Sequence, residues 1–338
     1  MSVEQHKNID VLAIGDVVTD AFIKLLDDQA WVEDRDGKKI LCMPFGTKIP
    51  FDHAEVIEAV GNASNAAVAF SRLGLKSGLV SNVGEDNWGR DIIKSLQGKK
   101  VDTRFVHINT DKVSNYHYVL WYKEERTILI KHEDYDYHWP RFREPDMPKW
   151  LYFSSISERA IDHYHDAIAT WLERYPDIKL AFQPGTFQMN AGVEKLKRIY
   201  ARSEVVLLNR EEAVSVFGGD YHDLHDLFNR MHGIGIKIAV ITDGPNGAYA
   251  SDGANRYKMP IYPDIAPPLE RTGAGDAFSS TLVAGLMLGA TLEEALRWAP
   301  INSMNVVQHV GAQAGLLTMS ELIDLLSKAP DWYKPEKI

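Results

Sequence analysis

The segment best suited to chemistry is residues 271–278, which read RTGAGDAF. Three small residues, Gly273, Ala274 and Gly275, lead into a stretch whose apolar residues recur at helical spacing, so a tight loop enters a helix. Backbone N–H groups at a helix N-terminus lack partners inside the helix, and the helix dipole adds partial positive charge there. The segment therefore predicts an anion site suited to phosphate.

Asp276 follows this loop and adds a carboxylate in the first helical turn, where the dipole stabilises it. A carboxylate beside a bound phosphate can accept the proton of an attacking hydroxyl. Phosphoryl transfer needs such a base together with electrostatic stabilisation of the moving group. Taken alone, the segment is equally compatible with a glycine-rich turn and a favourable first-turn Asp.

Two motifs that precede this segment suit a nucleotide. Asn209 and Glu212, in NREE, have the spacing of a capping box, and they also offer an amide and a carboxylate to the hydration shell of Mg²⁺. Thr242 and Gly244 lie in TDGPNG, which is at the same time a strong turn signal. Both motifs therefore keep a structural interpretation beside the chemical one.

Two motifs near the N-terminus suit a polyol. Asp20 either caps the turn after the first strand or accepts two hydroxyl protons. Gly61, Asn62 and Asn65 lie in VGNASNAA, at the start of an expected helix. Asn62 also suits the N-cap, whereas Asn65 would sit inside the helix, where Asn is unfavourable without a ligand, so Asn65 is the stronger candidate.

In this order the five motifs, over residues 10–316, resemble those of the ribokinase-like, or PfkB, carbohydrate kinases. The resemblance implies that Asp276 is the catalytic base and that the amides of the preceding Gly-Ala-Gly form the anion hole. It implies ATP and Mg²⁺ as cofactors. It places the remaining candidates along the nucleotide and metal (Asn209, Glu212, Thr242, Gly244, and Asn305 on the adenine side) and around the acceptor (Asp20, Gly61, Asn62, Asn65).

Two departures from the family pattern bear on the site. Glu270 and Arg271 precede Thr272 where the family usually has Asp-Thr, and that Asp helps to hold a monovalent cation in several members. Either Glu270 replaces that Asp, or Arg271 replaces the charge of the cation, so cation dependence stays open. Arg271 is also a candidate for stabilising transition-state charge. Val60 replaces the first glycine of the acceptor motif.

Short apolar runs alternate with amphipathic stretches, which predicts a single α/β domain over residues 1–338 with a mostly parallel sheet in a three-layer α/β/α arrangement. Residues 17–55 and 112–137 break this rhythm with alternating, aromatic-rich stretches. They predict a small β-sheet lid, with a hairpin tip at residues 123–126; the alternative is that they are edge strands of the main sheet. Expected strands are 10–14, 78–83, 150–154, 178–182, 205–208 and 236–242, and expected helices are 62–73, 160–174, 190–201, 211–217, 222–233, 276–288, 292–308 and 319–327.

The composition is that of a soluble globular protein: 338 residues, 45% hydrophobic and 25% charged. A net charge of −10 argues against nucleic acid and anionic membranes as partners. A single cysteine, Cys42, fits a reducing compartment, and the polar N-terminus has no signal-peptide core, so we expect a cytoplasmic protein. Neither a Walker A motif nor HExxH occurs, and His163 and His165 are expected at the surface.

The sequence thus predicts a kinase that phosphorylates an exocyclic hydroxyl of a small sugar of the ribose, fructose or keto-deoxy sugar acid type. A nucleoside kinase of the same family and a non-catalytic sugar or nucleotide sensor are the alternatives. The lid aromatics Tyr116, Tyr118 and Trp121 either form a homodimer face, as the family resemblance implies, or only cover the pocket.

Overall fold

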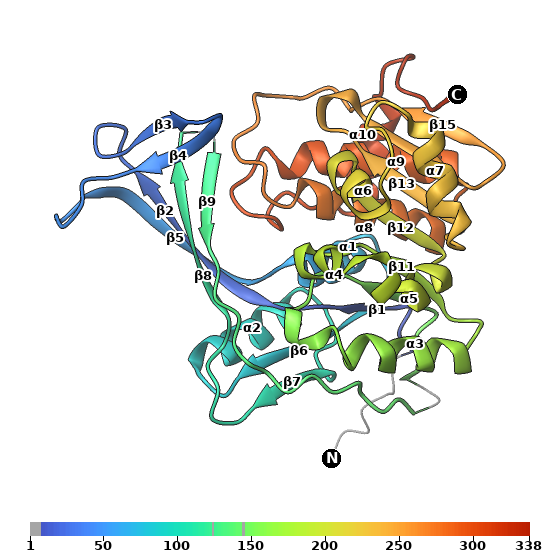
Figure 1. Ribbon diagram of the computed structural model, residues 1–338, viewed down its shortest axis with the longest axis horizontal. Coiled ribbons are helices and arrows are strands. Elements are labelled where there is room, and N and C mark those ends of the chain that lie inside the picture. Colours follow the sequence, from blue (N-terminus) through green and yellow to red (C-terminus); the bar gives the residue numbers. More distant parts are fainter. Residues whose placement is uncertain (1–7, 124, 144–145) are drawn as a thin grey trace.

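The computed structural model describes residues 8–123, 125–143 and 146–338 and is built around one large sheet (Figure 1). The strands of this sheet are β1 (Val11–Ile14), β6 (Ser77–Gly84), β7 (Val106–Asn109), β10 (Trp150–Phe153), β11 (Lys179–Phe182), β12 (Val205–Asn209), β13 (Ile238–Thr242), β14 (Ala248–Ser251), β15 (Arg256–Met259) and β16 (Glu336–Lys337). Their order is β16-β15-β14-β13-β12-β11-β10-β1-β6-β7. The strands from β7 to β13 in this order are parallel, and β14, β15 and β16 are antiparallel to their neighbours.

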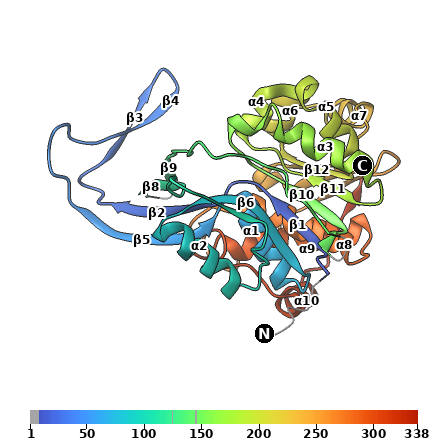
Figure 2. The same ribbon diagram turned by 90° about the horizontal axis from the view of Figure 1, so that it is seen from below.

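Helices cover both faces of this sheet. They are α1 (Asn62–Arg72), α2 (Asn87–Gly98), α3 (Tyr164–Arg174), α4 (Thr186–Lys195), α5 (Lys197–Arg202), α6 (Arg210–Phe217), α7 (Leu224–Gly233), α8 (Ala274–Met287), α9 (Leu292–Val306) and α10 (Met319–Ser327). Helices α3 to α7 lie on one face, and α1, α2, α8, α9 and α10 lie on the other (Figure 2). The predicted three-layer α/β/α fold is confirmed.

The first strand shows why the sequence folds in this way. Leu12 and Ile14 pack with α3, α5, α6 and α7, whereas Val11 and Ala13 pack with the helices of the other face. A strand covered on both faces must be apolar at every position, and VLAI is. Such a continuous apolar run is the pattern from which a buried parallel strand is predicted.

Helix boundaries follow local capping signals. Thr291 and Glu294 form the capping box that the sequence predicts at the start of α9, with hydrogen bonds of 2.8 and 3.2 Å. Helix α10 matches its predicted range. Helix α2 was not predicted, although Asp86 caps it by accepting from the Gly89 N–H at 2.8 Å. The expectation that His165 lies at the surface is wrong, because its ring is buried and contacts the Ala160 carbonyl.

A separate small sheet stands to one side of the main sheet (Figure 1). Its strands are β2 (Val18–Leu25), β5 (Phe51–Val60), β8 (Tyr116–Tyr122) and β9 (Glu125–Leu129), in the order β5-β2-β8-β9, with the hairpin β3 (Trp31–Arg35) and β4 (Lys38–Cys42) beyond them. A small separate sheet was predicted and is confirmed, so these strands are not edge strands of the main sheet. The predicted tip at 123–126 is described except for Glu124, which lies outside the described residues.

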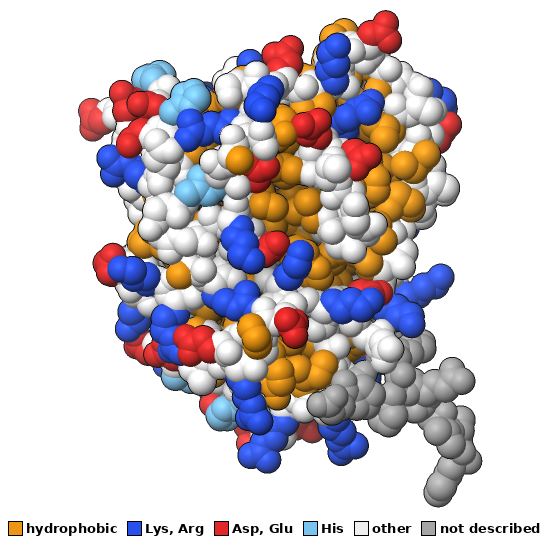
Figure 3. Space-filling model, turned by 90° about the vertical axis from the view of Figure 1, so that its right-hand side faces the viewer, with side chains coloured by type: hydrophobic (Ala, Val, Ile, Leu, Met, Phe, Trp, Pro, Cys, Tyr) orange, Lys and Arg blue, Asp and Glu red, His pale blue; other side chains and the backbone are white. Residues whose placement is uncertain are grey.

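The surface of this small sheet is apolar in part. Phe45, Phe51 and Tyr118 are exposed. Trp121, expected with Tyr116 and Tyr118 on one face, is instead 9% exposed and stacks under the Lys24 ammonium. On the side of the molecule remote from the small sheet, basic and acidic side chains are interspersed (Figure 3). Among the described residues, each helix is too short or too polar to cross a membrane.

Candidate active site

A cavity of about 630 Å³ lies where the small sheet meets the carboxyl ends of the main strands. Asp16, Ser155, Gln183 and Asn209 line it, and each follows or ends a parallel strand. The carboxyl edge of a parallel sheet is where ligands bind in open α/β folds. Strands β2, β8 and β9 of the small sheet supply the opposite wall, so the small sheet has the position of a lid over this cavity.

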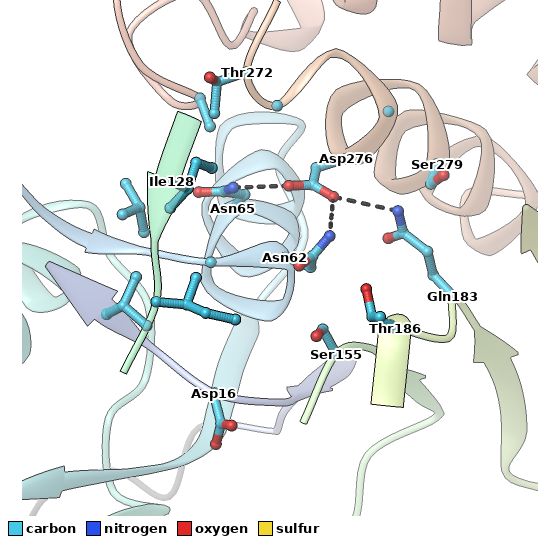
Figure 4. A pocket seen from close by; sticks show the side chains of 18 of the residues that line it. Asp16, Asn62, Asn65, Ile128, Ser155, Gln183, Thr186, Thr272, Asp276 and Ser279 are labelled. Atoms are coloured by element: carbon cyan, nitrogen blue, oxygen red, sulfur yellow. Dashed lines mark hydrogen bonds between the residues drawn. The ribbon is translucent and has the colours of Figure 1, made fainter. Parts of the chain in front are cut away.

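Asp276 lies in the first turn of α8 and is buried at the wall of the cavity (Figure 4). Its Oδ1 accepts hydrogen bonds from the Asn62 amide at 2.8 Å and from the Gln183 amide at 3.2 Å, and its Oδ2 accepts one from the Asn65 amide at 2.8 Å. Three neutral donors from two separate elements therefore hold one carboxylate in a fixed orientation.

Opposing effects act on the pKa of Asp276. Burial raises the pKa of this carboxyl above its usual value, and this is the largest effect. The amides of Asn65, Asn62 and Gln183 lower the pKa, and so does the positive charge of Arg126. The balance is a raised pKa, which gives a stronger base than an exposed Asp.

The loop before α8 leaves free amides beside this base. Gly273 is in the left-handed conformation, with φ of 79°, and a Cβ there would lie 2.3 Å from that of Ala312, so only glycine fits. The Ala277 N–H is bonded within the helix, to the Gly273 carbonyl at 2.8 Å. The N–H groups of Gly275 and Asp276 come before it and have no acceptor in the helix.

A second cavity of about 320 Å³ adjoins the first, and the two share Thr242, Arg271 and Gly275. Gly244 and Ala274 line the second cavity. Its other walls are mostly apolar, with Ile261, Tyr262, Phe278, Pro300, Met304 and Val307. A polar cavity and an apolar one meeting at a helix N-terminus have the layout that a nucleoside triphosphate needs, with phosphates at the junction.

Asn209 and Glu212 form the capping box of α6 and also line the larger cavity. The Asn209 Oδ1 accepts from the Glu212 N–H, and the Glu212 Oε2 accepts from the Asn209 N–H, both at 2.8 Å. Burial raises the pKa of Glu212, and the charge of Asp276 raises it further. Capping engages Oε2 of Glu212 and not Oε1, so capping and a metal role are compatible.

The acceptor candidates reach the cavity in different ways. Asp20 lines it from β2, and its Oδ1 is buried without a hydrogen-bond partner, 3.5 Å from Nδ1 of His117. Gly61 lines it through its backbone, and a Cβ there would lie 2.7 Å from the Asp16 carbonyl oxygen. Asn65 is fully engaged by the protein, because its Oδ1 also accepts from Gln313 at 2.9 Å. This bond accounts for an Asn inside a helix without a ligand.

Glu270 forms an ion pair with a partner that the sequence did not indicate. Its side chain is buried and pairs with the guanidinium of Arg126, a residue of β9, at 3.1 Å. The Thr272 N–H and the Gly311 N–H also donate to it, at 2.6 and 3.3 Å. The cation beside Glu270 is thus Arg126 rather than Arg271, which is exposed and lines both cavities.

Asn305 is not brought to either cavity, since its amide donates to the Gly315 carbonyl at 2.7 Å. Its place beside the adenine stays a prediction without geometric support. Four further residues line the larger cavity and were not predicted from the sequence: Gln183, Arg126, His117 and His132. Gln183 could have been found, because it follows a predicted strand at the edge where ligands bind. The other three come from the lid region, whose register the sequence does not fix.

The fold and the site together define a ribokinase-like kinase, and comparisons with known proteins agree. The sequence model of the pfkB family carbohydrate kinases matches residues 53–319. An ATP-dependent 6-phosphofructokinase from Thermoanaerobacterium thermosaccharolyticum is 27% identical over 263 residues, which cover 75% of this chain and 80% of the relative. The chain therefore belongs to the pfkB family and is a carbohydrate kinase.

Solved structures share the fold over nearly the whole chain. Ribokinase from Arabidopsis thaliana, complexed with ribose and ATP, superposes with a TM-score of 0.75 at 17% identity, over 94% of this chain and 98% of that one. The nucleoside kinase from Methanocaldococcus jannaschii gives a TM-score of 0.73 at 18% identity, over 95% of this chain and 99% of that one. At these identities the likeness concerns the fold.

Proposed function

We propose that this protein transfers the γ-phosphoryl group of ATP to an exocyclic hydroxyl of a small neutral sugar. One observation carries the proposal: Gly275 lines both cavities at the tip of α8, and the next residue, Asp276, faces the larger one. ATP would place its base in the smaller cavity and its terminal phosphate at the junction, with the acceptor sugar under the lid.

In this mechanism the acceptor hydroxyl lies against Asp276, which takes its proton as the oxygen attacks the γ-phosphorus. The bond from the γ-phosphorus to the bridging oxygen of the β-phosphate breaks, and ADP leaves. The Gly275 and Asp276 N–H groups stabilise the negative charge of the transferred group. Arg271 is exposed at the junction and is suited to the same role. The lid excludes water, which would otherwise compete with the sugar for the phosphoryl group.

Mg²⁺ fits the donor set of this site. Among the described residues no group of three or more His, Cys, Asp and Glu side chains could hold a metal alone, and Mg²⁺ commonly binds through phosphates, waters and one or two carboxylates. Glu212 and Asn209 would contact the hydration shell. When bound, the ion neutralises charge on the phosphates.

The acceptor wall favours a neutral polyol over a sugar acid. It carries the Asp20 carboxylate, whereas the cation in the same wall, Arg126, is paired with Glu270. Asp16 also lines the cavity, but its two carboxylate oxygens accept from the Tyr137 hydroxyl and the Ser157 N–H. The buried Oδ1 of Asp20 and Nε2 of His117 have no hydrogen-bond partner in the protein, so an acceptor with several hydroxyls would satisfy them. A carboxylate on the substrate would instead meet the like charge of Asp20.

The test is ADP release with ATP, Mg²⁺ and a panel of pentoses, hexoses, keto-deoxy sugar acids and nucleosides, with ³¹P NMR to locate the new phosphate. Neutral sugars should give the highest kcat/KM. A preference for a sugar acid or a nucleoside would overturn the choice of acceptor, and binding without ADP release would indicate a sensor. Asp276→Asn should still bind ATP but lose about 10²–10⁴ in kcat, and an active Asn variant would refute the base assignment.

We further propose that the protein acts in the cytoplasm as a homodimer that pairs through the lid. The exposed apolar residues Phe45, Phe51, Val56, Tyr118 and Leu129 support this pairing, since a monomer would leave them in water. Light scattering should give twice the mass of the 38.1 kDa chain, and Phe45→Glu should lower it. A monomeric wild type at micromolar concentration would contradict the proposal.

A further inference from the structure

Two of the amides that hold Asp276 are themselves held from behind by residues outside the proposed chemistry. Asn65 is backed by Gln313, from the segment after α9, and Gln183 is backed by Tyr152, from β10. Gln313 and Tyr152 are buried. Asn62, the remaining donor, also lines the larger cavity and points to Asp276 (Figure 4).

The first support is a chain of hydrogen bonds that starts at a lysine. The Lys99 ammonium donates to Oε1 of Gln313 at 2.6 Å. Nε2 of Gln313 donates to the Ala59 carbonyl at 2.7 Å and to Oδ1 of Asn65 at 2.9 Å. The Asn65 Nδ2 then donates to Asp276 at 2.8 Å.

Lys99 and the Ala59 carbonyl determine which group donates and which accepts in this series of hydrogen bonds. An ammonium can only donate and a backbone carbonyl can only accept, so Lys99 and Ala59 allow Gln313 one orientation of its amide. That orientation presents a donor to Asn65, whose oxygen must turn toward it. The Asn65 Nδ2 is then directed at Asp276, where it stabilises an ionised carboxylate more strongly than a protonated one.

The second support comes from another element and is a hydroxyl, which can donate or accept but donates in this structure. The Tyr152 hydroxyl donates to Oε1 of Gln183, so Nε2 of Gln183 faces Asp276. The ring of Tyr152 is fixed by edge-to-face contact with Phe70, with centroids 5.3 Å apart. Two independent backing groups therefore orient two of the donors around one carboxylate.

We propose that Gln313, anchored by Lys99, and Tyr152 are positioning residues that lock the amides of Asn65 and Gln183 as donors toward Asp276 and so keep the base ionised and aimed. This inference rests on the proposed role of Asp276. Neither residue touches ATP or the acceptor in this scheme, since neither lines the two cavities.

Several charged or titratable groups lie around Asp276 and contribute to its pH response. Arg126, from β9, lowers the pKa of Asp276. Asp276 raises the pKa of Glu212, from α6, and that of Tyr152. Both test variants leave Arg126 and Glu212 unchanged. Because Gln313→Glu adds a negative charge that itself raises the pKa of Asp276, only a shift that Tyr152→Phe shows as well reports the amides.

The test compares Gln313→Glu and Tyr152→Phe with the wild type. Gln313→Glu keeps a partner for Lys99 but removes the donor to Asn65, whose amide can then turn its oxygen toward Asp276. Loss of one donor to a charged group should raise the pKa of Asp276 by about one unit. The midpoint of the acidic limb of the kcat–pH profile should rise by the same amount. At pH values well below that midpoint kcat should be about tenfold lower, with KM for ATP unchanged.

Tyr152→Phe keeps the ring packing and should shift the acidic limb of the kcat–pH profile in the same direction. If Gln313→Glu does not fold, the result for Tyr152→Phe alone tests the proposal. Gln188→Glu is the matched control, because Gln188 is a buried glutamine that contacts Ser154 and His165 rather than Asp276. It should lower thermal stability without moving the limb. Reduced stability with an unshifted limb in both test variants would overturn the proposal.

A readout without turnover separates this inference from the proposed function. The ¹³C signal of the Asp276 carboxyl, assigned by its absence in Asp276→Asn, can be titrated in each variant. An upward shift of its midpoint in Gln313→Glu and Tyr152→Phe supports the lock even if no acceptor is phosphorylated. An unchanged midpoint refutes the lock even in an active kinase.

Discussion

The ion pair between Arg126 and Glu270 ties the lid to the loop that precedes α8, and its removal is the sharpest test of how the two parts cooperate. Arg126 belongs to β9 and its side chain is 28% exposed, whereas that of Glu270 is 4% exposed. The change Arg126→Met removes the guanidinium but keeps much of the apolar stem. Glu270 is then a buried carboxylate without a cation.

The expected cost is smaller than that of a fully buried pair. Breaking such a pair costs about 3–5 kcal/mol, because a buried charge loses its partner. Here Arg126 is partly solvated, and Glu270 keeps donors from the backbone N–H groups of Thr272 and Gly311. We therefore expect a loss of about 2 kcal/mol in the free energy of unfolding, or about 3 °C in Tm for a chain of this size.

Activity should change as well, and with a defined sign. The positive charge of Arg126 lowers the pKa of Asp276, so its removal raises that pKa. Asp276 accepts a proton only when it is ionised. The variant should therefore lose more kcat at pH 6 than at pH 8.

Urea unfolding and kcat at several pH values test both expectations. Glu270→Gln added to Arg126→Met should restore part of the stability, because the uncompensated charge is then gone. Arg104→Met is the control: Arg104 pairs with Asp102 and Asp146 away from the cavities and should affect stability alone. Wild-type stability of Arg126→Met, or a double variant less stable than either single one, would refute the reasoning.

Three further changes have defined outcomes. Gly273→Ala places a Cβ against Ala312 at a φ of 79° and should lower kcat about a hundredfold through the displaced amides, measured by ADP release. Asp243→Asn leaves the buried guanidinium of Arg210 without its partner at 2.6 Å, should cost about 3 kcal/mol in urea unfolding, and should raise KM for ATP; unchanged stability would contradict it. Burial lowers the pKa of His165 to about 4 from 6.5, so the unfolded chain binds a proton first as the pH falls, and about 3 kcal/mol of stability should be lost between pH 6.5 and 4, less so in His165→Gln.

The sequence predicted the main sheet well because its parallel strands are buried on both faces and read as continuous apolar runs. Strands β7 and β14 to β16 were missed, since they are short and lie toward the two ends of the sheet. The turn signal at Thr242–Gly247 was correct as a turn, because β13 and β14 form a hairpin there. Residues of this turn also line the two cavities. The same short motif therefore both forms the turn and contributes to the candidate site.

The candidate site was predicted where function depends on local spacing. The loop before α8 and the capping box of Asn209 and Glu212 are contiguous in sequence, so their geometry follows from helix chemistry. The pairing of Arg126 with Glu270 joins residues 144 positions apart. It depends on the register of β8 against β2 and β9, which tertiary packing determines and local pattern does not.

The two walls of the larger cavity come from different sheets. Substitutions in one wall and in the other should therefore affect different properties of the enzyme, the choice of acceptor and the rate of transfer. Exchanges on β2, β8 and β9, such as those at Asp20 and His117, should alter which alcohol is chosen while the phosphate end is preserved. Exchanges in the loop before α8 should slow the transfer to every alcohol alike. A new acceptor preference can therefore be engineered by grafting lid strands onto an untouched catalytic helix.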